Sequence, residues 1–400
     1  MRLMKIITVN LGVTLLLLIG INVIAALLYD AKTLLKPGFN PAEQISQKID
    51  QQYALAPYKD KKAGYQILSE VENMGTDYKS FVGWSRKPYR GKTTTVDEAG
   101  DRQHSGESST PTGTVRLFGG SAMWGRGAAD QGTIPALLNR AFPDYQVFNH
   151  GEAGFTSRQA LARLINIANQ AEDLGTVVFY DGVNDIYTHC WTKGGINTHA
   201  RERYIRGRLD GDVENETLLQ KLENTSLGPV FLTETYKLLL SAKEYLAPSK
   251  GPVKQTIKSR SRCQNDPRYA RRVAMTLIEN WKLAKSIVEA RGGRFIAVLQ
   301  PVIYMGRPVT EHVKKPKDLP RLEGDYKSIY PIIQSELRKM SASWVADFTD
   351  VFDVDEPLYI DFCHVTEIGN TFVVKRLAAL MRNSVNISLN GVPISAPTQN

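Results

Sequence analysis

Four short stretches of the sequence combine glycines with side chains that could act together in acyl transfer. They are Phe118–Gly125 (FGGSAMWG), Asn149–Ser157 (NHGEAGFTS), Tyr180–Ile186 (YDGVNDI) and Asp361–His364 (DFCH). A serine hydroxyl is a weak nucleophile until a base removes its proton, and an imidazole does this best when a carboxylate fixes its tautomer. Ser121 is therefore the candidate nucleophile, His364 the candidate base and Asp361 the acid that orients the base.

The same stretches offer hydrogen-bond donors for the negative oxygen of a tetrahedral intermediate. We expect an oxyanion hole from the backbone N–H groups of Ser121 and Gly154 and the side-chain amide of Asn184, each worth ~3 kcal/mol. Glycines without Cβ atoms would let the backbone approach a substrate closely. The spacing of three residues predicts that Asp361 and His364 lie on one side of a helical turn and face one site.

The three cysteines do not suggest a metal or redox site. Cys190, Cys263 and Cys363 show no CxxC spacing, so we predict no metal and no other cofactor. If one disulfide forms, we expect it between Cys190 and Cys263, with Cys363 left reduced because it lies between Asp361 and His364.

Short apolar strands alternate with helices from Val115 onward, which predicts a parallel sheet covered by helices on both faces. Ligand sites of such sheets form at the carboxyl ends of the strands, where three of the four chemical stretches lie. The interval 187–266 breaks the alternation and is interpreted as an insertion. The expected strands cover 115–119, 145–151, 176–182, 294–301 and 343–348, and the expected helices cover about 132–142, 156–172, 267–291, 326–340 and the residues after Glu367.

In this order, the four stretches resemble the conserved blocks of the SGNH hydrolases, also called GDSL-like esterases and lipases. The family's Ser, Gly, Asn and His would correspond to Ser121, Gly154, Asn184 and His364, with Asp361 as the third triad member. The resemblance covers about 113–385 and implies an α/β, three-layer, flavodoxin-like fold with a five-stranded parallel sheet and metal-independent ester hydrolysis. It departs from the family where the usual Gly-Asp-Ser is replaced by Gly-Gly-Ser.

An uncharged run, Ile6–Tyr29, is long enough to cross a bilayer as a helix. The charges around it place the N-terminus inside, so we expect a single-pass membrane anchor and a catalytic domain outside the cytoplasm. A cleaved signal peptide is the alternative. The expected organisation is an anchor at 1–30, an extension and linker at 31–112, a hydrolase domain at 113–385 and a tail at 386–400.

The chain has 400 residues, enough to bury a full core, and a formal net charge of +9. The basic excess favours acidic glycans or lipid headgroups, and the expected location disfavours nucleic acid. The preferred substrate is an O-acyl, chiefly acetyl, ester of a cell-envelope carbohydrate, with the aromatic residues Tyr187, Trp191 and Tyr204 as candidate sugar platforms. The alternatives are a carbohydrate O-acyltransferase, a lipid ester hydrolase that uses Pro229–Leu246, and an inactive carbohydrate-binding scaffold. Protein partners are not predicted.

Several other conspicuous residues are expected to be structural. Trp124 could line an acyl pocket or pack beneath the serine. Six other polar residues are predicted to pack or to form structural hydrogen bonds, without a role in catalysis or metal binding. They are His150, Asp181, Asp185, His189, Cys190 and His199.

Overall fold

The computed structural model describes residues 41–104, 110–171, 173–191, 195–202, 261–314 and 319–389, with single positions between 10 and 24 and at 205. Within these residues, no helix has the length and apolar character needed to span a membrane. The anchor expected at Ile6–Tyr29 falls largely outside the described residues, as does most of the expected insertion. The chain divides into two units, and the fold described below is that of Ile45–Arg203 with Ser259–Asn400.

The centre of this unit is a five-stranded parallel sheet, which confirms the α/β fold class. Its strands pair in the order β6-β5-β7-β8-β9, the flavodoxin-like order in which the chain reverses direction across the sheet after its second strand. All five expected strands are present. Their bounds are β5 (Gly113–Gly119), β6 (Tyr145–Asn149), β7 (Thr176–Asp181), β8 (Arg294–Leu299) and β9 (Val345–Asp347).

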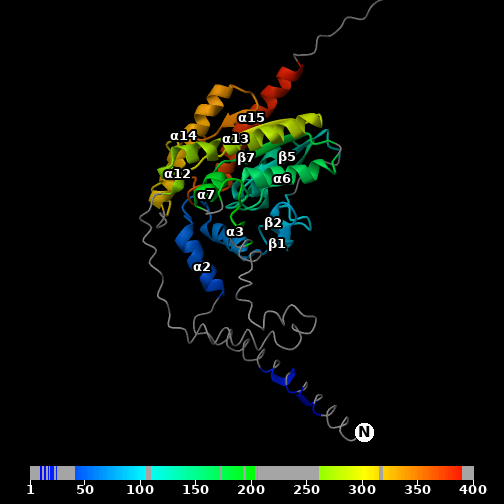
Figure 1. Cartoon of the computed structure of the whole chain (residues 1–400), viewed down its shortest axis with the longest axis vertical. Helices are drawn as coiled ribbons and strands as arrows, with labels where there is room; N and C mark the ends of the chain where they lie inside the picture. The colour runs from blue at the N-terminus through cyan, green and yellow to red at the C-terminus, as the bar shows by residue number, and fades with distance from the viewer. Residues whose placement is uncertain are drawn as a thin grey trace, which may run out of the picture. The chain divides into compact units, whose positions relative to one another are not determined.

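Helices cover both faces of the sheet (Figure 1). Neighbouring residues of β7 alternate between the two resulting cores: Phe179 lies in the core with α6 and α13, and Val178 lies in the core with α5 and α15. Burial on both faces explains why the central strands β7 and β8 are nearly continuous apolar runs in the sequence. The helices of the first face are α6 (Ser157–Ala168), α7 (Val183–Trp191), α13 (Pro267–Ala290) and α14 (Leu319–Met340), and those of the second are α5 (Ile134–Ala141) and α15 (Glu367–Leu389).

Several helical segments differ from the expectation or were not expected, among them α7, which lies where a loop was predicted. Helix α14 begins at Leu319, seven residues before the expected start at 326, and continues through Pro331. A 3-10 turn, η1 (Asp130–Gly132), precedes α5, and a short helix, α12 (Arg262–Asn265), precedes α13. Segments of three or four residues are too short to show helical periodicity in a sequence.

The segment before the sheet is folded and contacts the sheet unit through small cores of its own. Ile49 and Leu68 pack with Ile360, while Val71 and Val96 pack with Trp124. The expected domain boundaries remain a prediction, but residues 45–104 are joined to the unit by these cores. The elements of this segment are α2 (Pro41–Gln52), α3 (Lys61–Asn73) and two antiparallel hairpins, β1 (Thr76–Lys79) with β2 (Gly83–Arg86) and β3 (Tyr89–Arg90) with β4 (Thr95–Val96).

A disulfide joins Cys190 at the end of α7 to Cys263 in α12, with a Cα separation of 5.4 Å. This confirms the expected pairing. Cys363 is a buried free thiol, also as expected.

Candidate active site

Ser121 lies just beyond the carboxyl end of β5, next to the point between β5 and β7 where the strand order reverses. It is the first residue of the short helix α4 (Ser121–Trp124), and Gly120 is the N-cap. A Cβ on Gly120 would lie 2.2 Å from Asn184 Nδ2, and one on Gly119 would lie 2.5 Å from a β7 carbonyl oxygen. Both separations are too short for any side chain, so these two glycines allow Ser121 and Asn184 to approach each other.

A chain of hydrogen bonds joins Ser121 to His364 and Asp361. Ser121 Oγ lies 2.6 Å from His364 Nε2, and His364 Nδ1 lies 2.6 Å from Asp361 Oδ2. An ionised carboxylate accepts hydrogen bonds and cannot donate them, so we assign the ring proton to Nδ1. Nε2 then presents its lone pair to the Ser121 hydroxyl, which is the geometry a nucleophile and its base require.

The segment that carries Asp361 and His364 is a bend and not the expected helical turn. Asp361 Oδ1 accepts hydrogen bonds from the backbone N–H groups of Cys363 at 2.9 Å and His364 at 2.8 Å, which closes the bend from inside. Burial by itself raises the pKa of Asp361, but the His364 side chain and these hydrogen bonds together lower it below its usual value. The carboxylate therefore stays ionised beside the imidazole.

Two further sequence-predicted residues, Asn184 and Gly154, belong to neighbouring loops beside Ser121. Asn184 Nδ2 donates to the carbonyl of Phe155 at 2.9 Å, which ties the start of α7 to the loop after β6. Gly154 has a φ of 81°, a left-handed conformation that favours glycine. Within the described part of the chain, neither the Ser121 N–H nor the Gly154 N–H has a protein acceptor. Both groups can therefore donate to a bound oxygen.

Hairpin β1–β2 holds the loop that carries Gly154. Glu152 is fully buried; its carboxylate accepts from the backbone N–H of Arg86 at 2.8 Å and from that of Ala153 at 2.7 Å, and it lies 3.3 Å from Arg86 Nε. Trp84 Nε1 donates to the Ala153 carbonyl at 3.1 Å. Burial raises the pKa of Glu152 to about 7, against the lowering effect of Arg86. The loop after β6 is thus fixed by an earlier segment of the chain.

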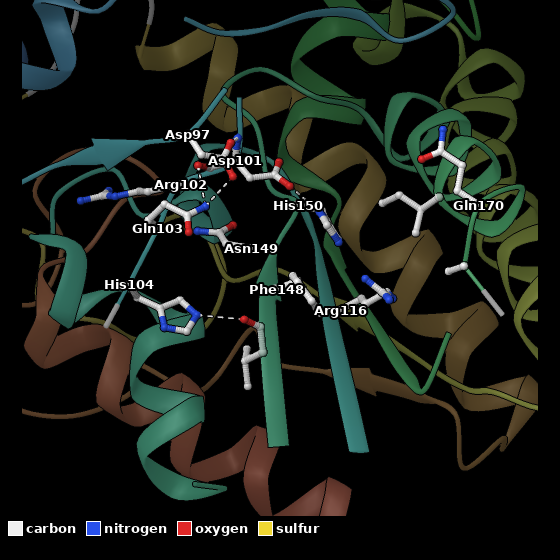
Figure 2. A pocket seen from close by; sticks show the side chains of 13 residues that line it. Asp97, Asp101, Arg102, Gln103, His104, Arg116, Phe148, Asn149, His150 and Gln170 are labelled. Carbon is white, nitrogen blue, oxygen red and sulfur yellow. Dashed lines mark hydrogen bonds and ion pairs between the residues drawn. The ribbon is translucent and has the colours of Figure 1, made fainter. Parts of the chain in front are cut away.

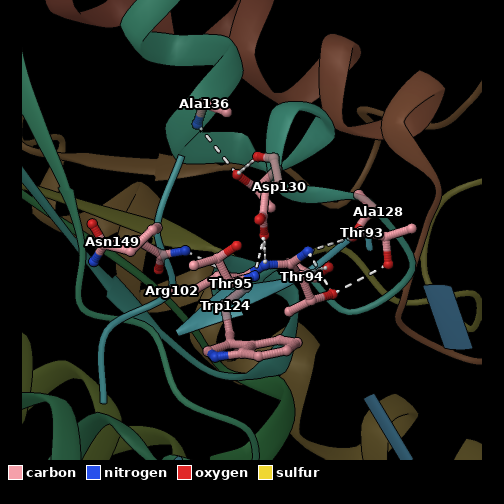
Figure 3. Close-up of polar contacts among 12 residues, drawn as sticks. Thr93, Thr94, Thr95, Arg102, Trp124, Ala128, Asp130, Ala136 and Asn149 are labelled. Atoms are coloured by element: carbon pink, nitrogen blue, oxygen red, sulfur yellow. Dashed lines mark hydrogen bonds and ion pairs between the residues drawn. The ribbon is translucent and has the colours of Figure 1, made fainter. Parts of the chain in front are cut away.

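Trp124, at the end of α4, is completely buried, and Figure 3 shows its ring beside Arg102. The Arg102 guanidinium lies over its ring, 4.5 Å from the centroid, and donates to the carbonyls of Gly125 at 2.6 Å and Ala128 at 2.7 Å. Arg102 Nε also pairs with Asp130 at 3.0 Å. Of the two roles considered for Trp124, the structure supports packing, and Arg102 connects this packing to the turn that follows Ser121.

A second buried network lies near Asp361 on the side of α3. Arg126 donates to the hydroxyl of Tyr53 and, at 2.9 Å, to Glu72. The same tyrosine donates to Glu72 at 2.8 Å, and Tyr58 donates to a carbonyl of the Arg126 loop at 2.9 Å. Burial raises the pKa values of both tyrosines, so they stay neutral donors. The Asp361 bend is therefore backed by hydrogen-bonded side chains from the N-terminal segment.

Asp361, Cys363 and His364 also place one potential metal ligand each within 4.8 Å of one another. Asp361 and His364 already bond to each other, and His364 bonds to Ser121 as well. Burial raises the pKa of Cys363, which keeps it a thiol, whereas metals bind the thiolate. The donor set fits the hydrogen-bonded serine site better than a metal site.

The other polar residues singled out in the sequence take part in packing or in internal hydrogen bonds. Asp181 accepts from Trp281 Nε1 at 3.1 Å, and Asp185 accepts from the Ser157 hydroxyl at 2.6 Å. His189 is buried, and His199 packs edge-on to the Trp84 ring.

Two of the three candidate sugar-stacking aromatics are described. Tyr187 is 40% exposed and stacks on Trp191, whose Nε1 donates to Asp325 at 3.0 Å. Tyr204 and the apolar run Pro229–Leu246 lie outside the described residues.

Sequence reasoning missed the residues that support the site. Glu152 lies inside the second glycine-containing stretch and Arg126 directly follows the first, and a charged residue in such surroundings is a usable signal for a buried ion pair. Arg102 and Trp84 gave no comparable signal, because their segment is polar and its strands are short.

Neither protein-family models nor curated proteins match this chain. Among solved structures, it is similar to a lipolytic protein of the G-D-S-L family from Veillonella parvula DSM 2008, at 11% identity, with 67% of this chain and 96% of that chain covered and a TM-score of 0.35. It is also similar to a carbohydrate acetylesterase family member from Sinorhizobium meliloti, at 15% identity, with 68% of this chain and 98% of that chain covered and a TM-score of 0.32. The inhibitor-bound aryl esterase of M. smegmatis is 13% identical, with 68% of this chain and 99% of that chain covered and a TM-score of 0.37. These structural neighbours are esterases or lipolytic proteins, but the values are too low to assign the chain to a family.

Proposed function

We propose that this chain is a serine ester hydrolase of the SGNH type that works through an acyl-enzyme. The observation that carries the proposal is the continuous hydrogen-bonded series from Ser121 Oγ through His364 to Asp361, with 2.6 Å at each step. The N–H groups of Ser121 and Gly154, which have no acceptor among the described residues, support it, as does Asn184 Nδ2 packed against Gly120.

In the proposed reaction, Ser121 Oγ attacks the ester carbonyl carbon while its proton moves to His364 Nε2. The ionised Asp361 stabilises the imidazolium, and the three donors hold the oxyanion. His364 then gives its proton to the departing alcohol oxygen, which leaves an acyl group on Ser121. Water, deprotonated by His364, attacks this acyl group and releases the acid. A sugar hydroxyl in place of that water would give acyl transfer with the same residues.

The proposed substrate is an O-acyl, chiefly acetyl, ester on a carbohydrate. Ser121, Gly154 and Asn184 all remain partly exposed, so the reacting oxygen can be reached from the surface by an ester carried on a bulky polymer. The partly exposed Tyr187 lies on the helix that begins beside Asn184 and offers an aromatic face for a sugar ring. A lipid ester would instead be favoured by a long apolar channel for its chain.

The decisive experiment labels the full chain with a fluorophosphonate probe and measures hydrolysis of a short-chain aryl acetate. Ser121→Ala and His364→Ala should abolish labelling and nearly all activity, while Asn184→Ala should lose about 10²-fold in rate and stay folded. Ser286→Ala on the exposed face of α13 is the matched control and should behave as the parent chain. Activity retained in Ser121→Ala would end the covalent mechanism.

Acyl chain length separates the proposed substrate from lipid. We expect acetyl esters to be hydrolysed far faster than octanoyl esters. Rates that rise with chain length would instead favour a lipid ester hydrolase.

The proposed location is the outer side of a membrane, with Ile6–Tyr29 as the anchor. The Cys190–Cys263 disulfide supports a compartment outside the cytoplasm, because cytosolic thiols are kept reduced. Protease added to intact spheroplasts should digest the chain beyond residue 30. Protection until the membrane is lysed would show that the orientation is wrong.

A further inference from the structure

A groove made up of two cavities that share part of their lining lies on the β6 side of the sheet unit. One, of about 430 Å³, lies over β5 and β6 against the end of α6 (Figure 2), and the other, of about 500 Å³, lies between α6 and hairpin β1–β2. They share the lining residues Asp101, His150, Ile167 and Gln170. Neither cavity is lined by Ser121, His364 or Asp361, so the groove is separate from the proposed ester site.

Three residues that line the first cavity each have a buried polar atom with no partner among the described residues. The atoms are Arg116 Nε, His150 Nε2 and His104 Nδ1. A buried polar atom without a hydrogen bond costs about 1–3 kcal/mol, so three such atoms at one cavity are a signal for a polar ligand.

His150 and Arg116 offer opposite hydrogen-bonding character. His150 is 6% exposed, and its Nδ1 lies 3.0 Å from Asp101, a carboxylate that also pairs with Arg163. Burial lowers the pKa of His150 to about 3, with the Arg116 charge as a second cause, so the ring is neutral and Nε2 is an acceptor. The Arg116 guanidinium lies 4.6 Å from the centroid of the Phe148 ring and is a donor. A ligand must therefore both donate and accept.

The second cavity is bordered by aromatic side chains at the tip of hairpin β1–β2. Phe81 is 90% exposed and has a φ of 63°, a left-handed conformation that bulky residues rarely adopt. Tyr78, nearby on β1, is 71% exposed. The fold gains little from burying Phe81 and bears a backbone cost for holding it there, which is the kind of strain found at ligand sites.

We propose that this groove, formed by Tyr78, Phe81, His150 and Arg116, binds a glycan chain. A sugar hydroxyl donates and accepts at once, so one sugar can satisfy both His150 Nε2 and Arg116 Nε. The apolar face of a neighbouring sugar ring can stack on the exposed aromatic rings at the hairpin tip. A membrane surface would also suit exposed aromatic residues beside Lys79, but it would leave the polar atoms of the first cavity without partners.

The test is isothermal titration calorimetry on the detergent-solubilised full chain with cellotetraose, chitotetraose and tetragalacturonate. We expect at least one of them to bind and Phe81→Asn to weaken that binding about tenfold, while thermal stability is kept or raised because Asn tolerates a positive φ. Leu283→Gln, at an exposed apolar position of α13, is the control and should change nothing.

Arg116→Met tests the cavity floor, because it keeps the length of the side chain and removes the donor. It should also weaken binding, without changing hydrolysis of a small aryl acetate. No binding of any of the three saccharides at millimolar concentration would overturn the proposal, as would binding that both variants leave unchanged. Loss of phosphatidylglycerol vesicle binding in Phe81→Asn, without saccharide binding, would assign the hairpin to a membrane surface. Because the readout is equilibrium binding, none of these outcomes depends on the chemistry of Ser121.

Discussion

Replacing Arg102 with methionine tests whether the N-terminal segment supports the serine turn. The guanidinium is 1% exposed, donates to the carbonyls of Gly125 and Ala128 and to the Thr94 hydroxyl at 3.4 Å, and pairs with Asp130 at 3.0 Å. Methionine keeps the unbranched apolar stem but removes every donor and the charge.

The expected loss follows from what remains buried after the change. Removing one partner of a buried ion pair costs about 3–5 kcal/mol, because the other charge stays behind without compensation. Asp130 keeps a hydrogen bond from Thr95 N at 3.1 Å, and its side chain is 18% exposed, which reduces this cost. The carbonyl oxygens of Gly125 and Ala128 also lose their cationic donor, which offsets that reduction. We expect the free energy of unfolding to fall by about 3–5 kcal/mol.

Urea unfolding of the full chain, followed by tryptophan fluorescence, measures this loss. Activity should fall as well, by about tenfold, because the N–H groups of Gly125 and Arg126 close the helical turn on the Ser121 carbonyl. Arg90→Met, the same substitution at an exposed position of β3, is the control and should cost less than about 0.5 kcal/mol. A loss of less than about 1 kcal/mol for Arg102→Met, or one no larger than that of Arg90→Met, would show that Arg102 does not support the serine turn.

Three further predictions concern the glycines, the buried acid and the disulfide. Gly120→Ala should leave the chain folded but reduce the rate of ester hydrolysis by about 10²-fold, because the new Cβ must displace the Asn184 side chain. An unchanged rate would show that Asn184 is not an oxyanion donor. The pKa of Glu152 rises from 4.5 to about 7 on folding, so its contribution to stability is full below pH 4.5 and is lost as the pH rises through 7. Thermal melts of Glu152→Gln should lack this decline. Identical pH profiles of melting temperature for the two chains would contradict the raised pKa. Cys190→Ser should lower the free energy of unfolding by about 2–5 kcal/mol in urea titrations, and a chain insensitive to reductant would argue against a structural role for the bridge.

The parallel sheet could be predicted because its strands are buried on both faces and leave uninterrupted apolar runs such as Val177–Tyr180. The candidate site could be predicted for a related reason. Ser121, Asn184 and the Gly154 loop each follow a strand directly, and parallel strands bring their carboxyl ends to one edge. The bend at Asp361 was harder, because spacing alone cannot tell a helical turn from a loop closed by its own aspartate.

The sequence did not reveal the partners of the supporting residues, because these residues break the rule that charged side chains stay in water. Arg102 and Glu152 are buried, each with a partner distant in sequence, and only the folded chain brings the partners together. The hairpin that carries Trp84 has strands of four residues, and the hairpin that precedes Arg102 has strands of two, which are too short to show an alternating pattern in the sequence. A folded segment of this kind reads as a polar linker.

The Cys190–Cys263 bridge holds together the two ends of the chain segment between these residues. Its two ends lie 5.4 Å apart at Cα, a span that two or three residues can bridge, although 73 positions separate them in sequence. The pairing order of the strands places no requirement on the length of what lies between, so a change of chain length there leaves the strand order of the sheet intact. We therefore expect insertions and deletions in related sequences to occur mainly between these two cysteines. New acyl acceptors could then be selected without any change at Ser121 or His364.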